Sequence, residues 1–209
     1  PASIREYLLE GLAHPEMETP KKLTNTRAYI HSVADPRSTC VAAANKAKEL
    51  GYTPYVLSTA LEGDACNLGI FFSGIANEVT KTGRPFAAPC AIISAGETTV
   101  TIHGPCGAGG PNQETALGYP LKLHAQSPTV CLSMDSDGTD GPSDIAGGIS
   151  DNQTFERACE LGLNLWEMLG RHDSSTALLQ LNDALITGHT GTNIMNFRVV
   201  VIEKKENES

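Results

Sequence analysis

The spacing of apolar residues changes along this chain between a helical period and the short apolar runs typical of strands. Where apolar positions recur every three to four residues, with a polar cap before them and a glycine after, the pattern predicts a helix. The helices predicted in this way span residues 3–12, 35–50, 62–82, 112–123, 154–161, 165–169 and 174–181. Short apolar runs predict strands at residues 27–33, 53–57, 90–94, 98–103, 129–134, 184–187 and 197–202.

The alternation of strands and helices predicts an α/β fold, with a layered mixed β-sheet and helices on both faces. Ligands of such folds bind beyond the carboxyl ends of the strands. We expect residues 1–24 to be a helix and linker from a preceding domain, 25–203 to form one α/β domain, and 204–209 to be a disordered tail. The chain begins at Pro1 without a signal peptide, which favours a start inside a longer protein.

Composition and charge argue against two classes of partner. The 209 residues carry a formal net charge of −9, which argues against binding to nucleic-acid backbones. No apolar run approaches the roughly 18 residues that indicate a membrane span. Six cysteines without a C-x-x-C spacing suit reduced, buried thiols in a cytoplasmic protein: Cys40, Cys66, Cys90, Cys106, Cys131 and Cys159.

Residues 94–151 hold ten of the 20 glycines, seven Asp or Glu residues and a single basic residue, Lys122. Their first polar loop, residues 104–114, leaves a predicted strand and opens a predicted helix. Free backbone N–H groups at such a helix start can hold a phosphate or a carboxylate. The loop lacks the pattern of a P-loop and of a dinucleotide-binding loop, so a tight turn without a ligand is an equal alternative.

The second polar loop is acidic, with Asp135, Asp137, Asp140 and Asp144 inside ten residues. Carboxylates this close raise one another's pKa unless a cation or N–H donors compensate. The spacing does not fit an EF-hand, whereas magnesium held by one or two carboxylates together with a phosphate does fit. The alternative is a set of Asx-turns with Asp144 capping a helix.

Three further features are candidates for binding. Residues 187–193 combine glycines with small hydroxyl side chains between two predicted strands, which indicates an anion-binding loop. Arg198 either supplies a positive charge or is a surface residue of a strand. Cys106 is a candidate reactive thiol without an evident base beside it in sequence, and His172 is expected at the surface or partly buried.

Four motifs occur in a fixed order along the chain. They read Gly-Glu-Thr-Thr-Val at 96–100, Gly-Gly-x-Asn-Gln-Glu-x-Ala-Leu at 109–117, Asp-Gly-Thr-Asp-Gly-Pro-x-Asp-x-Ala-Gly at 137–147, and Thr-Gly-x-Thr-Gly-Thr-Asn at 187–193. Together they resemble the C-terminal (MOFRL) domain of the class II glycerate 2-kinases, a family also labelled hydroxypyruvate reductase. Residues 45–52 and 61–65 resemble the segment that precedes this domain.

The resemblance implies ATP- and magnesium-dependent phosphorylation of D-glycerate to 2-phosphoglycerate. It also implies a cleft between this domain and an N-terminal kinase domain of the same protein, which supplies a lysine, so the isolated fragment is expected to be inactive. Expected partners are D-glycerate or a related hydroxy acid, that N-terminal domain and a second copy in a homodimer. Neither nucleic acid nor membrane is expected.

The resemblance also implies roles for residues of the motifs. The expected catalytic residues are Asp137, Asp140 and Glu114. The expected metal ligands are Asp135, Asp137 and Asp144. The residues expected to bind substrate or phosphate are Gly107, Gly109, Gly110, Asn112, Gln113, Thr139, Thr190, Gly191, Thr192 and Asn193.

One departure from the family pattern keeps other functions open. The family's glycine loop usually reads G-[KR]-G-[KR]-G-G-R-N-Q-E, and its basic positions are here Cys106, Ala108 and Pro111. A transferred phosphoryl group carries negative charge that carboxylates alone would repel. The alternatives are a non-catalytic or divergent domain that binds a small anion, and, third, a hydroxypyruvate reductase.

Overall fold

The computed structural model describes residues 1–22, 26–124 and 128–204, and it divides the chain into the units Pro1–Val33 and Ala34–Ser209. The first unit contains helix α1 (Ala2–Ala13) and the 3-10 helix η1 (Pro15–Met17). The predicted helix 3–12 is therefore confirmed. No residue of α1 is buried, and Leu12 is 82% exposed, so this amphipathic helix has no core of its own.

The strand predicted at residues 27–33 is wrong. These residues form no regular element, and the apolar side chains of Tyr29, Ile30 and Val33 are almost fully exposed. A strand is held by a neighbouring strand, and within the described residues this segment has none to pair with.

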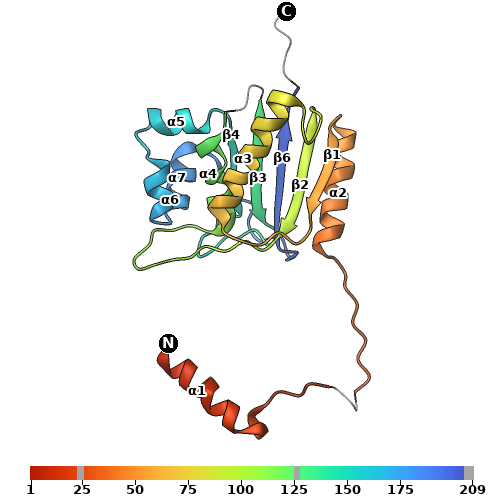
Figure 1. Ribbon diagram of the computed structural model, residues 1–209, viewed down its shortest axis with the longest axis vertical. Coiled ribbons are helices and arrows are strands. Elements are labelled where there is room, and N and C mark those ends of the chain that lie inside the picture. The colour runs from red at the N-terminus through yellow and green to blue at the C-terminus, as the bar shows by residue number, and fades with distance from the viewer. Residues whose placement is uncertain (23–25, 125–127, 205–209) are drawn as a thin grey trace, which may run out of the picture. The chain divides into compact units, whose positions relative to one another are not determined.

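The second unit is built on one six-stranded sheet with the order β1-β2-β6-β3-β4-β5 (Figure 1). Strand β1 is parallel to β2, and β6 is antiparallel to both β2 and β3, so β1, β2 and β3 run in the same direction. The remaining pairs, β3 with β4 and β4 with β5, are antiparallel. The strands are β1 Thr53–Ser58, β2 Cys90–Gly96, β3 Thr129–Asp135, β4 Gly147–Asp151, β5 Ala184–Leu185 and β6 Asn196–Ile202.

Helices cover both faces of this sheet, because alternate residues of the central strands are apolar on each side. Ile92 belongs to the core that includes Phe72 of α3, whereas the next residue, Ile93, packs in a core with Cys40 of α2. The layered α/β fold with a mixed sheet is thus confirmed. The helices are α2 Pro36–Glu49, α3 Ala65–Thr82, α4 Pro111–Gly118, η2 Pro120–Lys122, α5 Thr154–Glu160, α6 Leu165–Gly170 and α7 Ser174–Leu181.

Two strand assignments need correction. Residues 98–103 form no strand, and their only ladder contact in the described chain is an isolated bridge between Asp64 and Thr99. Strand β4 was not predicted, because it opens with Gly147 and Gly148, which weaken a strand pattern. It is held there by antiparallel pairing with β3.

The cysteines and the helices can be compared with what the sequence predicted about buried thiols and membrane spans. All six cysteines are free, and Cys40, Cys90 and Cys131 are buried as expected. Cys106 and Cys159 are exposed, so the expectation of buried thiols is wrong for these two. Among the described helices, none has the length and apolar character needed to cross a bilayer.

Candidate functional site

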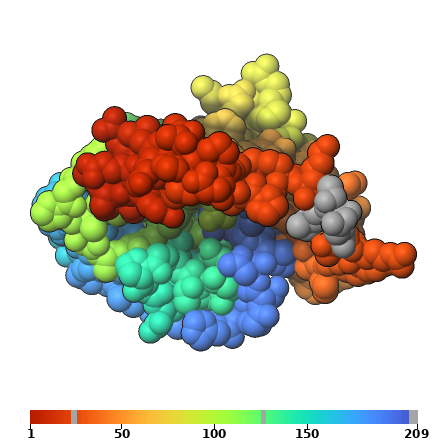
Figure 2. Space-filling view, turned by 90° about the horizontal axis from the view of Figure 1, so that it is seen from below, coloured from red at the N-terminus to blue at the C-terminus, as the bar shows by residue number. Residues whose placement is uncertain are grey.

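The candidate site lies at the edge where β2 and β3 end and β6 begins, which is the lower edge of the sheet in Figure 1. The register places Asn196 opposite both Gly96 of β2 and Asp135 of β3. The acidic loop leaves β3 here, and residues 187–195 enter β6 here. Figure 2 views this edge and shows the two segments, teal and blue, side by side.

Two other loops pack closely against the acidic loop: residues 187–193 at Gly138, and the glycine loop at Gly141. Gly138 has φ +94°, and a Cβ atom there would lie 2.0 Å from the carbonyl oxygen of Gly188. Gly141 has φ +66°, and a Cβ there would lie 2.3 Å from the carbonyl oxygen of Gly109. Both positions therefore require glycine for conformation and for close approach. Although the glycine loop follows no strand, the three predicted loops do meet at one edge.

On one side of the acidic loop, residues 187–193 are hydrogen-bonded to Asp137 and to its neighbour Ser136. The Asn193 side-chain amide donates to Asp137 Oδ2 at 3.1 Å, and the Thr190 N–H donates to the Asp137 carbonyl at 3.1 Å. The Thr190 hydroxyl donates to the Ser136 carbonyl at 2.5 Å. The other oxygen of Asp137 accepts bonds from the N–H and hydroxyl of Thr139 at 2.9 and 3.0 Å. Three residues predicted for binding, Thr139, Thr190 and Asn193, thus surround Asp137, while Gly191 and Thr192 are exposed beside them.

On the other side, Asp140 connects the acidic loop to the start of α4. Its Oδ1 accepts bonds from the N–H and side-chain amide of Asn112 at 3.1 and 3.0 Å, and its Oδ2 accepts from the same two groups of Gln113 at 2.9 and 3.2 Å. The side chain is nearly fully buried, and burial raises its pKa, an effect that the backbone hydrogen bonds oppose. Both oxygens are therefore used to hold the loops together. The catalytic role of Asp140 stays a prediction.

Several N–H groups predicted to bind an anion already have protein acceptors. The N–H groups of Asn112 and Gln113 donate to Asp140, and that of Gly107 donates to the Arg171 carbonyl at 2.9 Å. The binding of phosphate by these groups stays a prediction, and the helix start is already satisfied without it.

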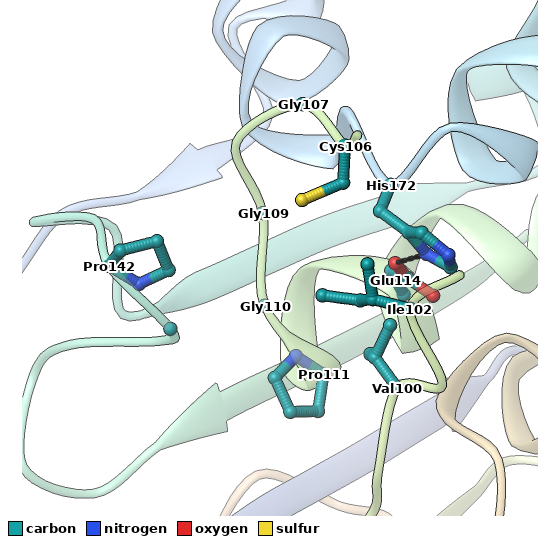
Figure 3. Close-up of a pocket in the computed structure, with 11 residues that line it drawn as sticks. Val100, Ile102, Cys106, Gly107, Gly109, Gly110, Pro111, Glu114, Pro142 and His172 are labelled. Atoms are coloured by element: carbon teal, nitrogen blue, oxygen red, sulfur yellow. Dashed lines mark hydrogen bonds and ion pairs between the residues drawn. The ribbon is translucent and has the colours of Figure 1, made fainter. Parts of the chain in front are cut away.

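A cavity of about 260 Å³ lies between the glycine loop, the acidic loop and the turn after α6 (Figure 3). Its polar end is Glu114, which is 3% exposed and whose Oε1 lies 2.9 Å from His172 Nδ1. Burial, more than any other influence, raises the pKa of Glu114, and the bond with His172 opposes this. The lining residues are Val100, Ile102, Cys106, Gly107, Gly109, Gly110, Pro111, Glu114, Gly141, Pro142 and His172.

The expected metal ligands are only partly assembled. Asp135 and Asp137 are neighbours, and the pKa of Asp135 is raised, first by burial and then by nearby carboxylates that include Glu97. Asp144 is exposed and lines a separate hollow with Gly138. Over the described residues, no three His, Cys, Asp or Glu side chains come together in a way that could hold a metal. Both residues carry the carboxylate oxygens that magnesium prefers as ligands, and their binding of magnesium stays a prediction.

Arg198 is the residue that the sequence pattern judged least well, whereas His172 is partly buried, as expected. Arg198 is fully buried, so of its two alternatives the one that makes it a surface residue of a strand is wrong. Its guanidinium donates to Thr98 Oγ1 at 2.6 Å and to the Gly96 carbonyl at 3.3 Å. Burial lowers its pKa to about 10, while nearby Asp140 raises it, so Arg198 places positive charge behind the acidic edge. The apolar run 199–202 that follows Arg198 in β6 was the available signal, because such a run indicates a strand buried on both faces.

Comparison with known proteins gives the family of this chain. The model of the MOFRL family matches residues 90–196, which include the three loops and the strands β2, β3 and β4. The chain therefore belongs to the MOFRL family, and the resemblance to the C-terminal domain of the glycerate 2-kinases is confirmed.

Named relatives match nearly the whole chain. It is 38% identical over 206 residues to a glycerate 2-kinase of Pyrococcus horikoshii, covering 98% of this chain and 46% of the relative. A putative hydroxypyruvate reductase of Agrobacterium vitis is 36% identical, with 97% of this chain and 45% of the relative covered. A crystal structure described as a glycerate kinase from Thermotoga maritima is 37% identical with a TM-score of 0.81, covering 88% of this chain and 44% of that one. The chain thus spans about half the length of these relatives.

Proposed function

We propose that this chain is the C-terminal half of a glycerate 2-kinase-like enzyme, which transfers the γ-phosphoryl group of ATP to the 2-hydroxyl of D-glycerate. The observation that carries the proposal is the 38% identity to a glycerate 2-kinase over 98% of the chain. In the reaction a bond forms between the glycerate oxygen and the γ-phosphorus, the bond from that phosphorus to the β-phosphate oxygen breaks, the proton of the 2-hydroxyl is released, and ADP leaves.

In this proposal, aspartates of the acidic loop would bind the metal ion. Asp135 and Asp137 would hold magnesium, which when bound offsets the negative charge of the phosphates. Asn193 and Thr139 hold the Asp137 carboxylate in place, so that its orientation does not have to be established during the reaction. The exposed Gly191 and Thr192 are the part of the 187–193 loop open to an anion. The half of the enzyme that this chain does not include would supply the lysine and close the cleft.

Coupled measurement of ADP release tests the proposal on the full-length protein with ATP, magnesium and D-glycerate. Asp137→Ala is expected to lower turnover about 100-fold or more, the size typical of losing a group that organises transition-state charge. Glu156→Gln, on the exposed side of α5, controls for the loss of one negative charge and should retain turnover. Unchanged turnover in Asp137→Ala would remove this aspartate from the mechanism, and no ADP release by the wild type would remove D-glycerate as the acceptor.

A divergent, non-catalytic domain is the second candidate. It is favoured by the cavity beside the glycine loop, whose lining includes Cys106 and Pro111 where the family pattern has basic residues. The third candidate, a hydroxypyruvate reductase, rests on the name of the Agrobacterium relative. Oxidation of NADH by the full-length protein in the presence of hydroxypyruvate would support the reductase instead of the kinase.

A further inference from the structure

Asn196 is a buried polar residue that lies outside the four motifs and next to a predicted metal ligand. It begins β6, and the register places it opposite Asp135, the last residue of β3. Residues opposite each other in a sheet point to the same face, so these two side chains are neighbours. Asn196 is 1% exposed, and a buried amide requires hydrogen-bond partners inside the protein.

The side-chain amide of Asn196 can be placed in two ways, and its neighbours decide between them. With the oxygen toward Asp135, two oxygens would face each other, and the nitrogen would face a donor of Arg198. With the amide turned, its nitrogen donates to Asp135 Oδ2 at 3.0 Å, and its oxygen accepts from Arg198 Nη2 at 3.2 Å. Turning gives up a bond of 2.9 Å from the side-chain nitrogen of Asn112, which keeps its bond to Asp140. Two bonds to charged groups outweigh one bond between neutral amides, so the turned amide is favoured.

Arg198 holds the oxygen end of this amide. Its guanidinium is anchored at two further points, because it donates to Thr98 Oγ1 at 2.6 Å and to the Gly96 carbonyl at 3.3 Å. The side chain is fully buried, and a guanidinium presents its donors in a rigid planar fork. A fork fixed in this way leaves the Asn196 amide one favourable direction.

Both carboxylate oxygens of Asp135 are then held from within the protein. Oδ2 accepts from Asn196, and Oδ1 accepts from the N–H of Asp137 at 3.3 Å. Each oxygen has more than one lone pair, so each keeps one for a metal ion. Hydrogen bonds to a metal ligand fix its direction before the metal binds, and their loss typically lowers metal affinity about 10- to 100-fold.

We propose that Asn196 is a positioning residue for the metal ligand Asp135, and that Arg198 acts through Asn196 by fixing the direction of its amide. This proposal rests on the proposed function, in which Asp135 holds magnesium. Neither Asn196 nor Arg198 touches the metal or the substrate. Metal affinity therefore depends on two residues buried behind the edge of the sheet, and Arg198 no longer affects it through the amide once Asn196 is removed.

The affinity of the full-length protein for Mn²⁺, a paramagnetic probe for the magnesium site, tests this proposal through the electron paramagnetic resonance signal of the free ion. Asn196→Ala is expected to weaken Mn²⁺ binding about tenfold or more. Arg198→Lys keeps the positive charge but replaces the fork by one ammonium group, which cannot hold Thr98 and Asn196 together, so a loss of about threefold is expected. The double variant should bind Mn²⁺ as Asn196→Ala does, because the two residues act in series.

Ser150→Ala is the matched control for the loss of a buried hydrogen bond. The Ser150 hydroxyl donates to the Ala116 carbonyl at 2.6 Å, so its removal should lower the free energy of unfolding but keep Mn²⁺ affinity within about twofold. Equal Mn²⁺ affinities of the wild type and Asn196→Ala would overturn the proposal. Losses that multiply in the double variant, or a loss in Ser150→Ala equal to that in Asn196→Ala, would overturn it as well. If Asn196→Ala does not fold, unchanged affinity in Arg198→Lys overturns it.

ADP release by the wild type, measured separately with D-glycerate, distinguishes this proposal from the proposed function. Weaker Mn²⁺ binding by Asn196→Ala without ADP release by the wild type would support the positioning role and remove D-glycerate as the acceptor. ADP release by the wild type together with unchanged Mn²⁺ affinity in Asn196→Ala would leave the kinase reaction and overturn the positioning role.

Discussion

The carboxylate of Asp140 accepts a hydrogen bond from the backbone N–H of Gln113, at 2.9 Å and across 27 residues of sequence. The Gln113 side chain turns back to the same residue, since its amide donates to the Asp140 carbonyl at 3.0 Å. Two family motifs are thus joined to each other inside the protein rather than both facing a ligand. The start of α4 is capped by a side chain from a distant loop, a task that an N-cap residue usually performs locally.

Replacing Asp140 by Asn should destabilise the protein by about 2–4 kcal/mol, because hydrogen bonds to a charged acceptor are lost and the new amide places donors against donors. Urea unfolding of the purified chain measures this. Asp144→Asn is the matched control, since Asp144 is exposed in the same loop, and it should change stability by about 0.5 kcal/mol or less. Equal effects of the two substitutions would show that the Asp140 bonds contribute little.

Replacing Gly138 by Ala should separate the acidic loop from residues 187–193. The new Cβ would lie 2.0 Å from the Gly188 carbonyl oxygen, so the two loops would have to move apart. The control is Gly162→Ala, because Gly162 also has a positive φ, +72°, but a Cβ there would meet nothing within 4 Å. We expect about 1 kcal/mol of destabilisation for Gly162→Ala and clearly more for Gly138→Ala, measured by urea unfolding. Equal losses would mean that conformational strain alone sets the cost at Gly138.

The pKa of Glu114 is raised by burial, and this predicts a specific pH dependence of stability. Because its pKa is higher in the folded chain than its usual 4.5, the folded state holds more protons between these two values, and stability falls as the pH rises through that window. Facing groups contribute in both directions: His172 lowers the pKa, whereas Asp64 and Asp140 raise it. Glu114→Gln removes the titration, so its stability relative to the wild type should increase through the window and then level off.

Urea unfolding at a series of pH values checks this difference. Glu156→Gln controls for the loss of one negative charge at an exposed position. A difference between Glu114→Gln and the wild type that does not change with pH would mean that Glu114 titrates alike in the folded and unfolded chains.

The local sequence pattern was sufficient to predict those elements whose stabilising contacts join residues close together in the sequence. The helix after Asp35 is an example: Asp35 and Ser38 form a capping box, and both lie within one turn. The acidic loop after β3 was located correctly for the same reason, since it follows an apolar strand that ends in carboxylates.

Contacts between distant residues account for what the pattern did not predict. From the sequence, Asp140 is a candidate metal ligand or catalytic acid. Its role in joining two loops depends on hydrogen bonds from Asn112 and Gln113, which are distant from it in sequence. His172 belongs to no motif, and its partner Glu114 lies 58 residues away. Residues 27–33 have the composition of a strand, but composition does not supply the neighbour with which a strand must pair.

Restoring a positive charge at Pro111 tests how the departure from the family pattern affects catalysis. Pro111 is in the first turn of α4, where a missing N–H has little consequence, and it lines the cavity together with Glu114. In the full-length protein, Pro111→Arg should increase kcat/KM for D-glycerate about tenfold, or about 1.4 kcal/mol in the barrier, because a cation there offsets the negative charge of the substrate. The control is Pro111→Met, which introduces a long uncharged side chain and should not raise kcat/KM. A gain in Pro111→Met equal to that in Pro111→Arg would assign the effect to the loss of proline, and no gain in either would place the anionic substrate away from residue 111.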